Sequence, residues 1–156
     1  MQWPNGMEPE QSNIHALNEI VIPAAPERIW RWLCRAERWP EWYGNCGWVR
    51  FRNSEGPDLQ PGTSFVWKTF GVRVRSKVLV YESALELGWD ATAFGLRAYH
   101  GWRFESASAG HTRVITEETQ VGRLTGVGRW YLRRALLREH QSWLEGLSRV
   151  AQTGDP

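Results

Sequence analysis

The sequence predicts an α+β domain, and three observations carry that prediction. Side-chain polarity alternates with a period of two through most of residues 46–121, which indicates strands with one buried and one solvated face. Apolar residues recur at spacings of three and four within residues 126–152, which indicates a long amphipathic helix. A shorter helical pattern follows the first strand. Helices segregated to one side of an antiparallel sheet make an α+β domain.

The composition fits one globular domain that binds no nucleic acid and does not span a membrane. At 156 residues the chain can bury roughly 70% of its surface on folding. The net charge is only +2, and a nucleic-acid binder is expected to concentrate more positive charge on one face. No run approaches the roughly 20 apolar residues of a membrane span. The unusual feature is the eleven tryptophans, which suit both cores and the walls of ligand sites.

The ends of the chain are expected to lie outside the domain. Residues 1–13 are polar and contain two prolines and a glycine, which is typical of a mobile tail. Residues 153–156 form a second, shorter tail. The predicted single domain therefore covers residues 14–152.

The first elements are a strand and two short helices. Residues 14–22 read as a strand that ends at a proline. Pro26 and Glu27 then mark the first turn of a helix, because proline fits that position and the helix dipole favours an acid there. The following segment, "ERWPEWYGN", places Trp39, Trp42 and Tyr43 at a chain break. These rings either cap the core or line a space that a ligand fills.

The next six segments are predicted strands, and one of them shows the clearest alternation. Within residues 72–81 the valines and Ser76 share one face, whereas Arg73, Arg75 and Lys77 share the other. The strands are expected at residues 46–52, 63–70, 72–81, 85–94, 96–105 and 111–121.

Cysteine usage indicates a reducing compartment. Cys34 and Cys46 fit no metal-binding spacing, and no secretory segment precedes them. The two residues are expected to be free thiols in a cytoplasmic protein.

These elements, in this order, resemble the helix-grip fold of the START/Bet v 1-like superfamily, particularly bacterial polyketide cyclase/dehydrase-type proteins. The resembling segments include "IVIPAAPERIWRWL", "ERWPEWYGN", "LELGWDATAFGLRAYHGWRFE" and "HQSWLEGLSRV", and they cover residues 15 to about 150. The resemblance implies a curved antiparallel sheet of about seven strands around the long C-terminal helix, with a hydrophobic cavity between them. Members bind lipids, polyketides, sterols, plant hormones or quinones, and some are cyclases or aromatases.

Strand parity and the helix position select the residues expected around that cavity. His100 and Glu118 would point into an apolar interior from neighbouring strands, where such a pair can act as general acid or base, hold a ligand, or be structural. Arg134 at the helix start could pair with a ligand oxygen. The predicted ligand-binding residues are Phe65, Trp67, Val74, Val78, Trp89, His100, Trp102, Glu118, Trp130, Arg134 and Leu137.

Other site chemistries are not supported. There is no GxSxG, P-loop or HExxH motif. The four histidines, His15, His100, His111 and His140, show no metal-like spacing, so no metal and no cofactor are expected.

Two functions remain. The first is binding of a small hydrophobic or aromatic molecule, such as a lipid, polyketide or quinone, in the internal cavity. The alternative is a polyketide cyclase, aromatase or dehydratase that uses His100 and Glu118 as general acid and base. The sequence does not decide between binding and catalysis, and it does not give the oligomeric state.

Overall fold

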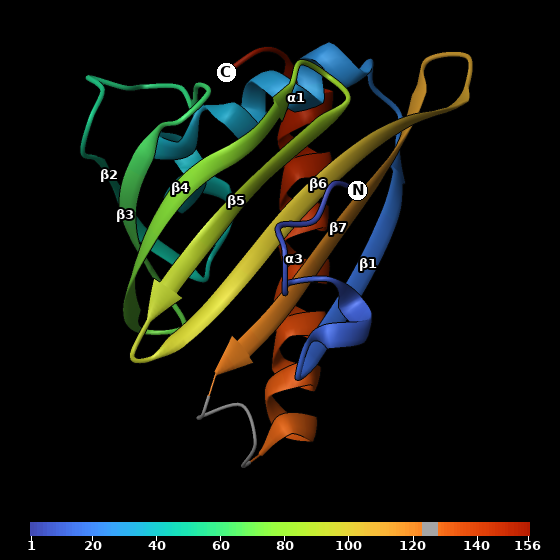
Figure 1. Ribbon diagram of the computed structural model, residues 1–156. Coiled ribbons are helices and arrows are strands. Elements are labelled where there is room, and N and C mark those ends of the chain that lie inside the picture. The colour runs from blue at the N-terminus through green and yellow to red at the C-terminus, as the bar shows by residue number, and fades with distance from the viewer. Residues whose placement is uncertain (123–127) are drawn as a thin grey trace.

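The computed structural model describes residues 1–122 and 128–156 and contains one antiparallel sheet (Figure 1). Its seven strands follow the order β1-β7-β6-β5-β4-β3-β2. The strands are β1 (Ile14–Ile22), β2 (Cys46–Phe51), β3 (Ser64–Thr69), β4 (Val72–Glu82), β5 (Glu86–Ala93), β6 (Leu96–Ser108) and β7 (His111–Gly122). The α+β prediction and the seven strands are therefore confirmed.

The helices also lie where the sequence pattern placed them. They are α1 (Pro26–Cys34), η2 (Ala36–Arg38), α2 (Trp39–Trp42) and the long α3 (Arg129–Thr153), with a short η1 (Pro9–Gln11) before the sheet. The first two residues of the predicted C-terminal helix, 126 and 127, lie outside the described residues.

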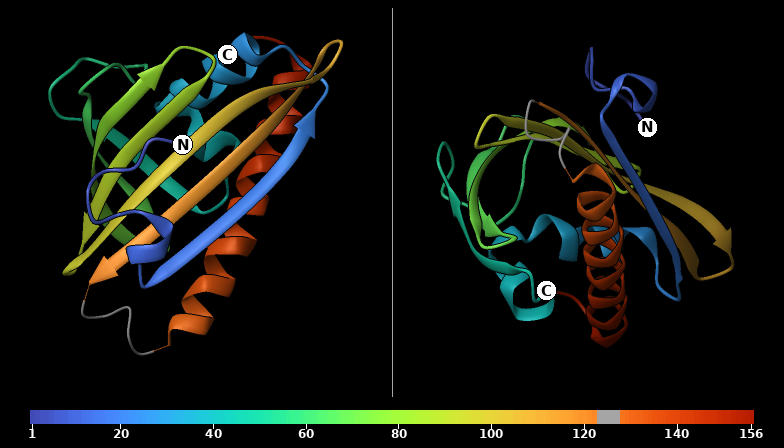
Figure 2. Two further views of the ribbon diagram at one scale, coloured as in Figure 1. Left: turned by 45° about the vertical axis from the view of Figure 1, so that its right-hand side comes forward. Right: turned by 90° about the horizontal axis from the view of Figure 1, so that it is seen from below.

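The sheet curves around α3, which lies on its concave side (Figure 2, right). The helix packs mainly along β1 at one edge of the sheet. Two hydrogen bonds to the helix fix this position: Asn18 Nδ2 donates to the carbonyl oxygen of Leu137 at 3.1 Å, and Arg133 Nε donates to that of His15 at 2.8 Å. Because the helix packs against this edge, most of the concave surface of β3–β6 is not covered by its backbone and is available to side chains or a ligand.

The tryptophan-rich break after α1 closes one end of the core. Trp39 is fully buried, and its Nε1 donates a hydrogen bond to the carbonyl oxygen of Leu33 at 2.8 Å. Gly146 of α3 allows this segment to approach closely, since an added Cβ would lie 2.3 Å from the carbonyl oxygen of Trp42. Trp39 and Trp42 thus cap the core, whereas Tyr43 faces the interior space described below.

The N-terminal segment, expected to be a mobile tail, packs on the convex face of the sheet (Figure 1). The rings of Trp3 and Tyr99 meet edge to face at 5.3 Å. Met7 is buried, and its carbonyl oxygen accepts a hydrogen bond from Thr119 Oγ1 at 2.7 Å. The segment is polar on average, but these two apolar side chains give it surface to bury against the sheet.

Strand parity agrees with the observed burial. The residues assigned to the concave face of β5, Leu87, Trp89 and Ala91, are all buried. The predicted concave-face residues of β3, β4 and β6 are buried as well, namely Phe65, Trp67, Val74, Val78, His100 and Trp102. Cys34 and Cys46 are free, as expected, and both are buried. None of the helices in the described residues is long and apolar enough to cross a bilayer.

Candidate functional site

Trp143 of α3 lies at the centre of the closed part of the interior. Its ring stacks on Tyr43, with centroids 4.3 Å apart and planes 3° apart. Trp39 and Trp102 meet the same ring edge to face, both at 5.1 Å. Large aromatic side chains therefore fill the space between the sheet and the C-terminal half of α3.

Toward the other end of the sheet the side chains become small, and a cavity opens. Ala91 on β5, Ala98 on β6 and Ala135 on α3 line the gap between the sheet and the helix, and none of these small side chains can fill it. The cavity volume is about 540 Å³, which lies within the usual range for small-molecule sites. Trp67, Trp89 and Trp143 contribute to its wall.

Exposed aromatic residues surround the open end. Phe70 and Phe94 lie at the tips of the β3–β4 and β5–β6 hairpins, and both also line the cavity. Phe94 is 75% exposed, and Tyr131 of the first turn of α3 is 69% exposed. The entrance thus lies between two hairpin tips and the start of the long helix.

Five of the predicted ligand-binding residues line this cavity, namely Trp67, Val74, Trp89, His100 and Glu118. Three others, Phe65, Val78 and Trp102, are packed in the closed core instead. The alternation of residues along each strand predicted correctly that these side chains lie on the concave face. It does not predict at which positions along a strand that face is filled by the core and at which it borders the cavity.

The three residues predicted on α3 do not line the cavity. Trp130 is 70% exposed, and the guanidinium carbon of Arg134 lies 4.6 Å above its ring, on the outer surface. Leu137 packs beside the small cluster that holds α3 to β1. The cavity-facing stripe runs instead through Leu136 and His140, and adjacent helical positions differ by about 100°. The one-residue error in helical phase explains the miss.

The structure brings together a polar cluster that only partly follows from the sequence. His100 on β6 and Glu118 on β7 are direct neighbours in register. His140 of α3 completes the group. His100 Nδ1 lies 3.3 Å and His140 Nε2 lies 3.2 Å from the same carboxylate oxygen, Glu118 Oε2. The only available sequence signal for His140 was its place on the buried stripe of α3.

Burial and mutual contacts determine the charges in this cluster. Burial, and then the neighbouring His140, lower the pKa of His100 to about 3, and the attraction of Glu118 offsets this only in part. Burial works to raise the pKa of Glu118. The hydrogen bond from His140, the nearby His100 and a hydrogen bond from Gln120 outweigh that effect, so its pKa lies below the usual range. At neutral pH His100 is therefore neutral and Glu118 is ionised.

Two indole N–H groups in the cavity wall lack a hydrogen-bond partner. Nε1 of Trp89 and Nε1 of Trp143 are buried without a partner among the described residues. By contrast, Trp67 Nε1 donates to Ser76 Oγ at 3.1 Å. A buried donor left unpaired costs roughly 1–3 kcal/mol, so a guest oxygen that reached either N–H group would recover part of that free energy.

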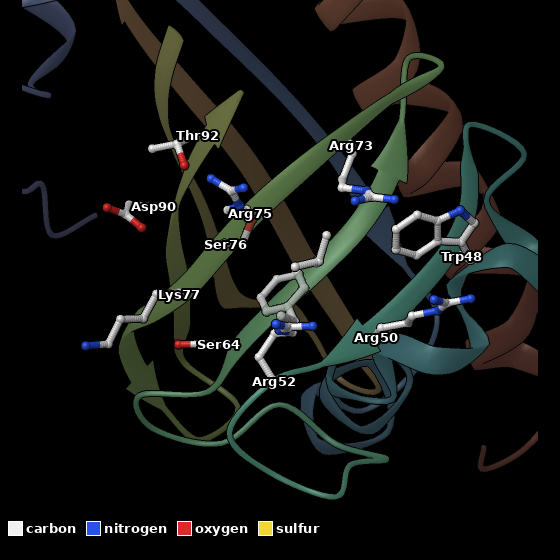
Figure 3. A pocket seen from close by; sticks show the side chains of 12 residues that line it. Trp48, Arg50, Arg52, Ser64, Arg73, Arg75, Ser76, Lys77, Asp90 and Thr92 are labelled. Atoms are coloured by element: carbon white, nitrogen blue, oxygen red, sulfur yellow. The ribbon is translucent and has the colours of Figure 1, made fainter. Parts of the chain in front are cut away.

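A second concavity, of about 600 Å³, lies on the convex face of the same sheet (Figure 3). We call it the outer groove. Arg50 and Arg73 lie beside Trp48, with guanidinium carbons 5.1 and 5.8 Å from its ring. In the described part of the chain, Asp90 is the one acidic residue of the lining. The cationic residues of the outer groove are Arg50, Arg52, Arg73, Arg75 and Lys77.

Comparison with known proteins assigns the chain to a family. The model of the family described as polyketide cyclase/dehydrase and lipid transport matches residues 14–152. The chain belongs to this family. The match covers every strand of the sheet and α3 up to residue 152, so the cavity between them lies within the family domain. No curated protein matches the chain in sequence.

Solved structures of this family's fold are similar over nearly the whole chain. A hypothetical protein of Helicobacter pylori is 26% identical, with a TM-score of 0.89 over 97% of this chain and 95% of its own. The Zhui aromatase/cyclase of a Streptomyces species is 15% identical, with a TM-score of 0.74 over 88% and 93%. The protein Ara h 8.0201 is 12% identical, with a TM-score of 0.72 over 90% and 98%. The Bet v 1-like helix-grip fold is thereby confirmed.

Proposed function

We propose that this protein binds a small, largely apolar molecule with acceptor oxygens in the cavity between the sheet and α3. The observation that carries the proposal is the cavity of about 540 Å³, whose wall includes Trp89 and Trp143, two residues with buried and unpaired indole N–H groups. Stacking on flat aromatic walls favours a flat guest. The two N–H groups favour carbonyl or hydroxyl oxygens on it.

This chemistry describes a polyketide, a quinone or an oxygen-bearing lipid. The family description names both polyketide cyclases and lipid transport, which supports this ligand class without choosing within it. The similar fold of an aromatase/cyclase supports the same class. Free, buried Cys34 and Cys46 are compatible with a cytoplasmic carrier.

A second candidate function is cyclisation or dehydration of a polyketide-like substrate. His100 and Glu118 favour it because both reach the cavity and contact each other. Their pKa values argue for a weaker role, since the pKa values of both groups lie below their ordinary range and a proton shuttle works best near the operating pH. If a polyketide substrate is turned over, His100→Ala and Glu118→Ala should each reduce the rate. Unchanged turnover would remove this assignment.

A cavity-filling substitution tests the binding proposal directly. Ala98 faces the cavity from β6, so Ala98→Phe places a ring inside it and is expected to weaken binding about tenfold or more. The matched control is Arg97→Phe, one residue earlier on the same strand and on its other face. Binding is measured by tryptophan fluorescence with a naphthoquinone, a fatty acid and an anthraquinone-type polyketide. If no probe binds the wild type, or if both variants bind equally well, the proposal fails.

A further inference from the structure

The cluster of His100, Glu118 and His140 has a geometry that ligand binding alone does not explain. One nitrogen from each imidazole and one carboxylate oxygen lie within 4.8 Å of one another. The two imidazole rings are 4.7 Å apart between centroids and come from different elements, β6 and α3. Three donor atoms of the kinds that bind metal ions thus converge on one point beside the cavity.

The spacing of these donors is closer to that of co-ligands than to that of strong hydrogen bonds. Charge-assisted N–H···O contacts are about 2.7–2.9 Å long, whereas the two histidine nitrogens lie 3.3 and 3.2 Å from Glu118 Oε2. Two ligands about 2.1 Å from a tetrahedral ion are separated by about 3.4 Å. An ion could therefore enter between the three side chains with little movement of the sheet.

The remaining atoms of two of these side chains are held by further hydrogen bonds. His100 Nε2 lies 2.7 Å from the hydroxyl of Thr116. Glu118 Oε1 accepts a hydrogen bond from Gln120 Nε2 at 2.6 Å. In metal sites such outer partners fix the orientation of the ligating ring and carboxylate. Both partners are present here and leave His100 Nδ1 and Glu118 Oε2 directed at the shared point.

We propose that His100, Glu118 and His140 bind one divalent transition-metal ion of the zinc type at the inner wall of the cavity. Two imidazoles and one carboxylate are a donor set that suits zinc and its neighbours, and three protein ligands leave a coordination position open. All three residues line the cavity, so the open position faces the guest.

The proposal adds a chemical requirement to the guest. Two neutral imidazoles and one carboxylate contribute a single negative charge as ligands, so a divalent ion leaves a net positive charge in an apolar enclosure. An enolate, phenolate or carboxylate oxygen on the guest would neutralise it. This goes beyond the proposed function, because an apolar molecule could occupy the cavity without any ion.

The test is a metal titration of the full chain after treatment with a chelator. Co²⁺ serves as the probe, because tetrahedral Co²⁺ absorbs visible light and quenches nearby tryptophans. Trp89 and Trp143 lie 5.0 and 5.3 Å from the His100 ring, so their fluorescence reports an ion at this position. We expect saturation at one Co²⁺ per chain, with displacement by Zn²⁺.

Four variants separate this position from chance binding. Glu118→Gln keeps the shape of the side chain but removes its charge, and His140→Ala removes one ligand; each should weaken Co²⁺ binding about 100-fold or more. Thr116→Val removes only the outer partner of His100 and should weaken it about tenfold. His111→Ala is the control, since His111 is exposed at the first position of β7 and its loss should have no effect. Circular dichroism confirms that each variant is folded.

Two results would overturn the proposal. Failure of the wild type to bind Co²⁺ or Zn²⁺ at one ion per chain would mean that the cluster is a hydrogen-bonded network only. Equal binding by wild type and folded Glu118→Gln would place any ion elsewhere. Quinone binding measured with chelator present keeps the two proposals apart, because cavity binding without metal affinity would leave the proposed function standing.

Discussion

The two faces of β4 differ sharply in polarity. Val74 and Val78 face the interior and are buried, whereas Arg75 and Lys77 between them line the outer groove (Figure 3). The strand pleat alone separates an apolar cavity wall from an arginine-rich surface. The comparison shows how one sheet can carry two unlike surfaces without a second domain.

The two faces also depend on different parts of the sequence. The inner face is completed by α3, whose Trp143 and His140 come from far along the chain. The outer face depends on register between neighbouring strands: Lys68 lies opposite Arg73, and Lys77 lies opposite Asp90. Asp90 is drawn instead toward Arg97, at 3.9 Å. The inner face is therefore determined by packing against α3, whereas the outer face is determined by an excess of positive over negative side chains.

A matched pair of tryptophan substitutions should give the largest contrast between the faces. Trp143→Ala removes a fully buried ring that stacks on Tyr43, and it should lower the free energy of unfolding by about 3–5 kcal/mol. Trp48→Ala removes a half-buried ring of the outer groove that contacts Arg50, and it should cost about 1 kcal/mol. Urea denaturation followed by circular dichroism measures both. Similar losses for the two variants would contradict this division.

The sequence was sufficient to predict which residues form the inner face of the sheet and to predict part of the candidate site. Period-two alternation identifies which residues of a strand share a face, so Trp67, Trp89 and His100 were placed inside correctly. Chain order within a known fold then made His100 and Glu118 neighbours. Both inferences use local periodicity, which the pleat translates directly into structure.

The remaining parts of the site depend on how separate elements pack in space, which the periodicity of the sequence does not predict. His140 joins the cluster because α3 leans along β1, and the phase of a helix about its axis is set by that packing. The same phase moved Trp130 and Arg134 to the surface. The outer groove was not predicted because its cations come from two separate parts of the chain, residues 50–52 and β4, and only the strand order brings them onto one surface.

Acid should weaken the inner face through its buried histidine. With a chelator present, the free energy of unfolding is expected to fall as the pH drops from about 6.5 toward about 3. The pKa of His100 is lowered to about 3 in the folded protein, so between these values the unfolded chain binds a proton that the folded chain does not. The loss reaches at most about 1.4 kcal/mol per pH unit. The lowered pKa of Glu118 adds a loss in the same direction at the acid end.

A substitution without a titrating ring isolates the histidine. His100→Gln should flatten the pH dependence of unfolding between about 4 and 6.5, whatever it does to stability at neutral pH. His111→Gln, at an exposed position, should leave the slope as it is in the wild type. The measurement is urea denaturation at a series of pH values. An unaltered slope in His100→Gln would show that other groups cause the acid sensitivity.

The smallest expected effect lies on the outer face, and its sign is informative. Arg75 lies between Arg73 and Lys77 on β4 and forms no ion pair with any residue that the structure describes. Arg75→Gln should raise the free energy of unfolding by a few tenths of a kcal/mol at low salt, because like charges on one face repel. The gain should shrink at physiological ionic strength, about 0.15 M, where the charges are screened.

Arg113→Gln is the control with the opposite expected effect. Arg113 on β7 pairs with Glu19 and Glu105, so its loss should lower the free energy of unfolding. If Arg75→Gln lowers the free energy of unfolding as Arg113→Gln does, the cations of the outer groove do not repel one another measurably.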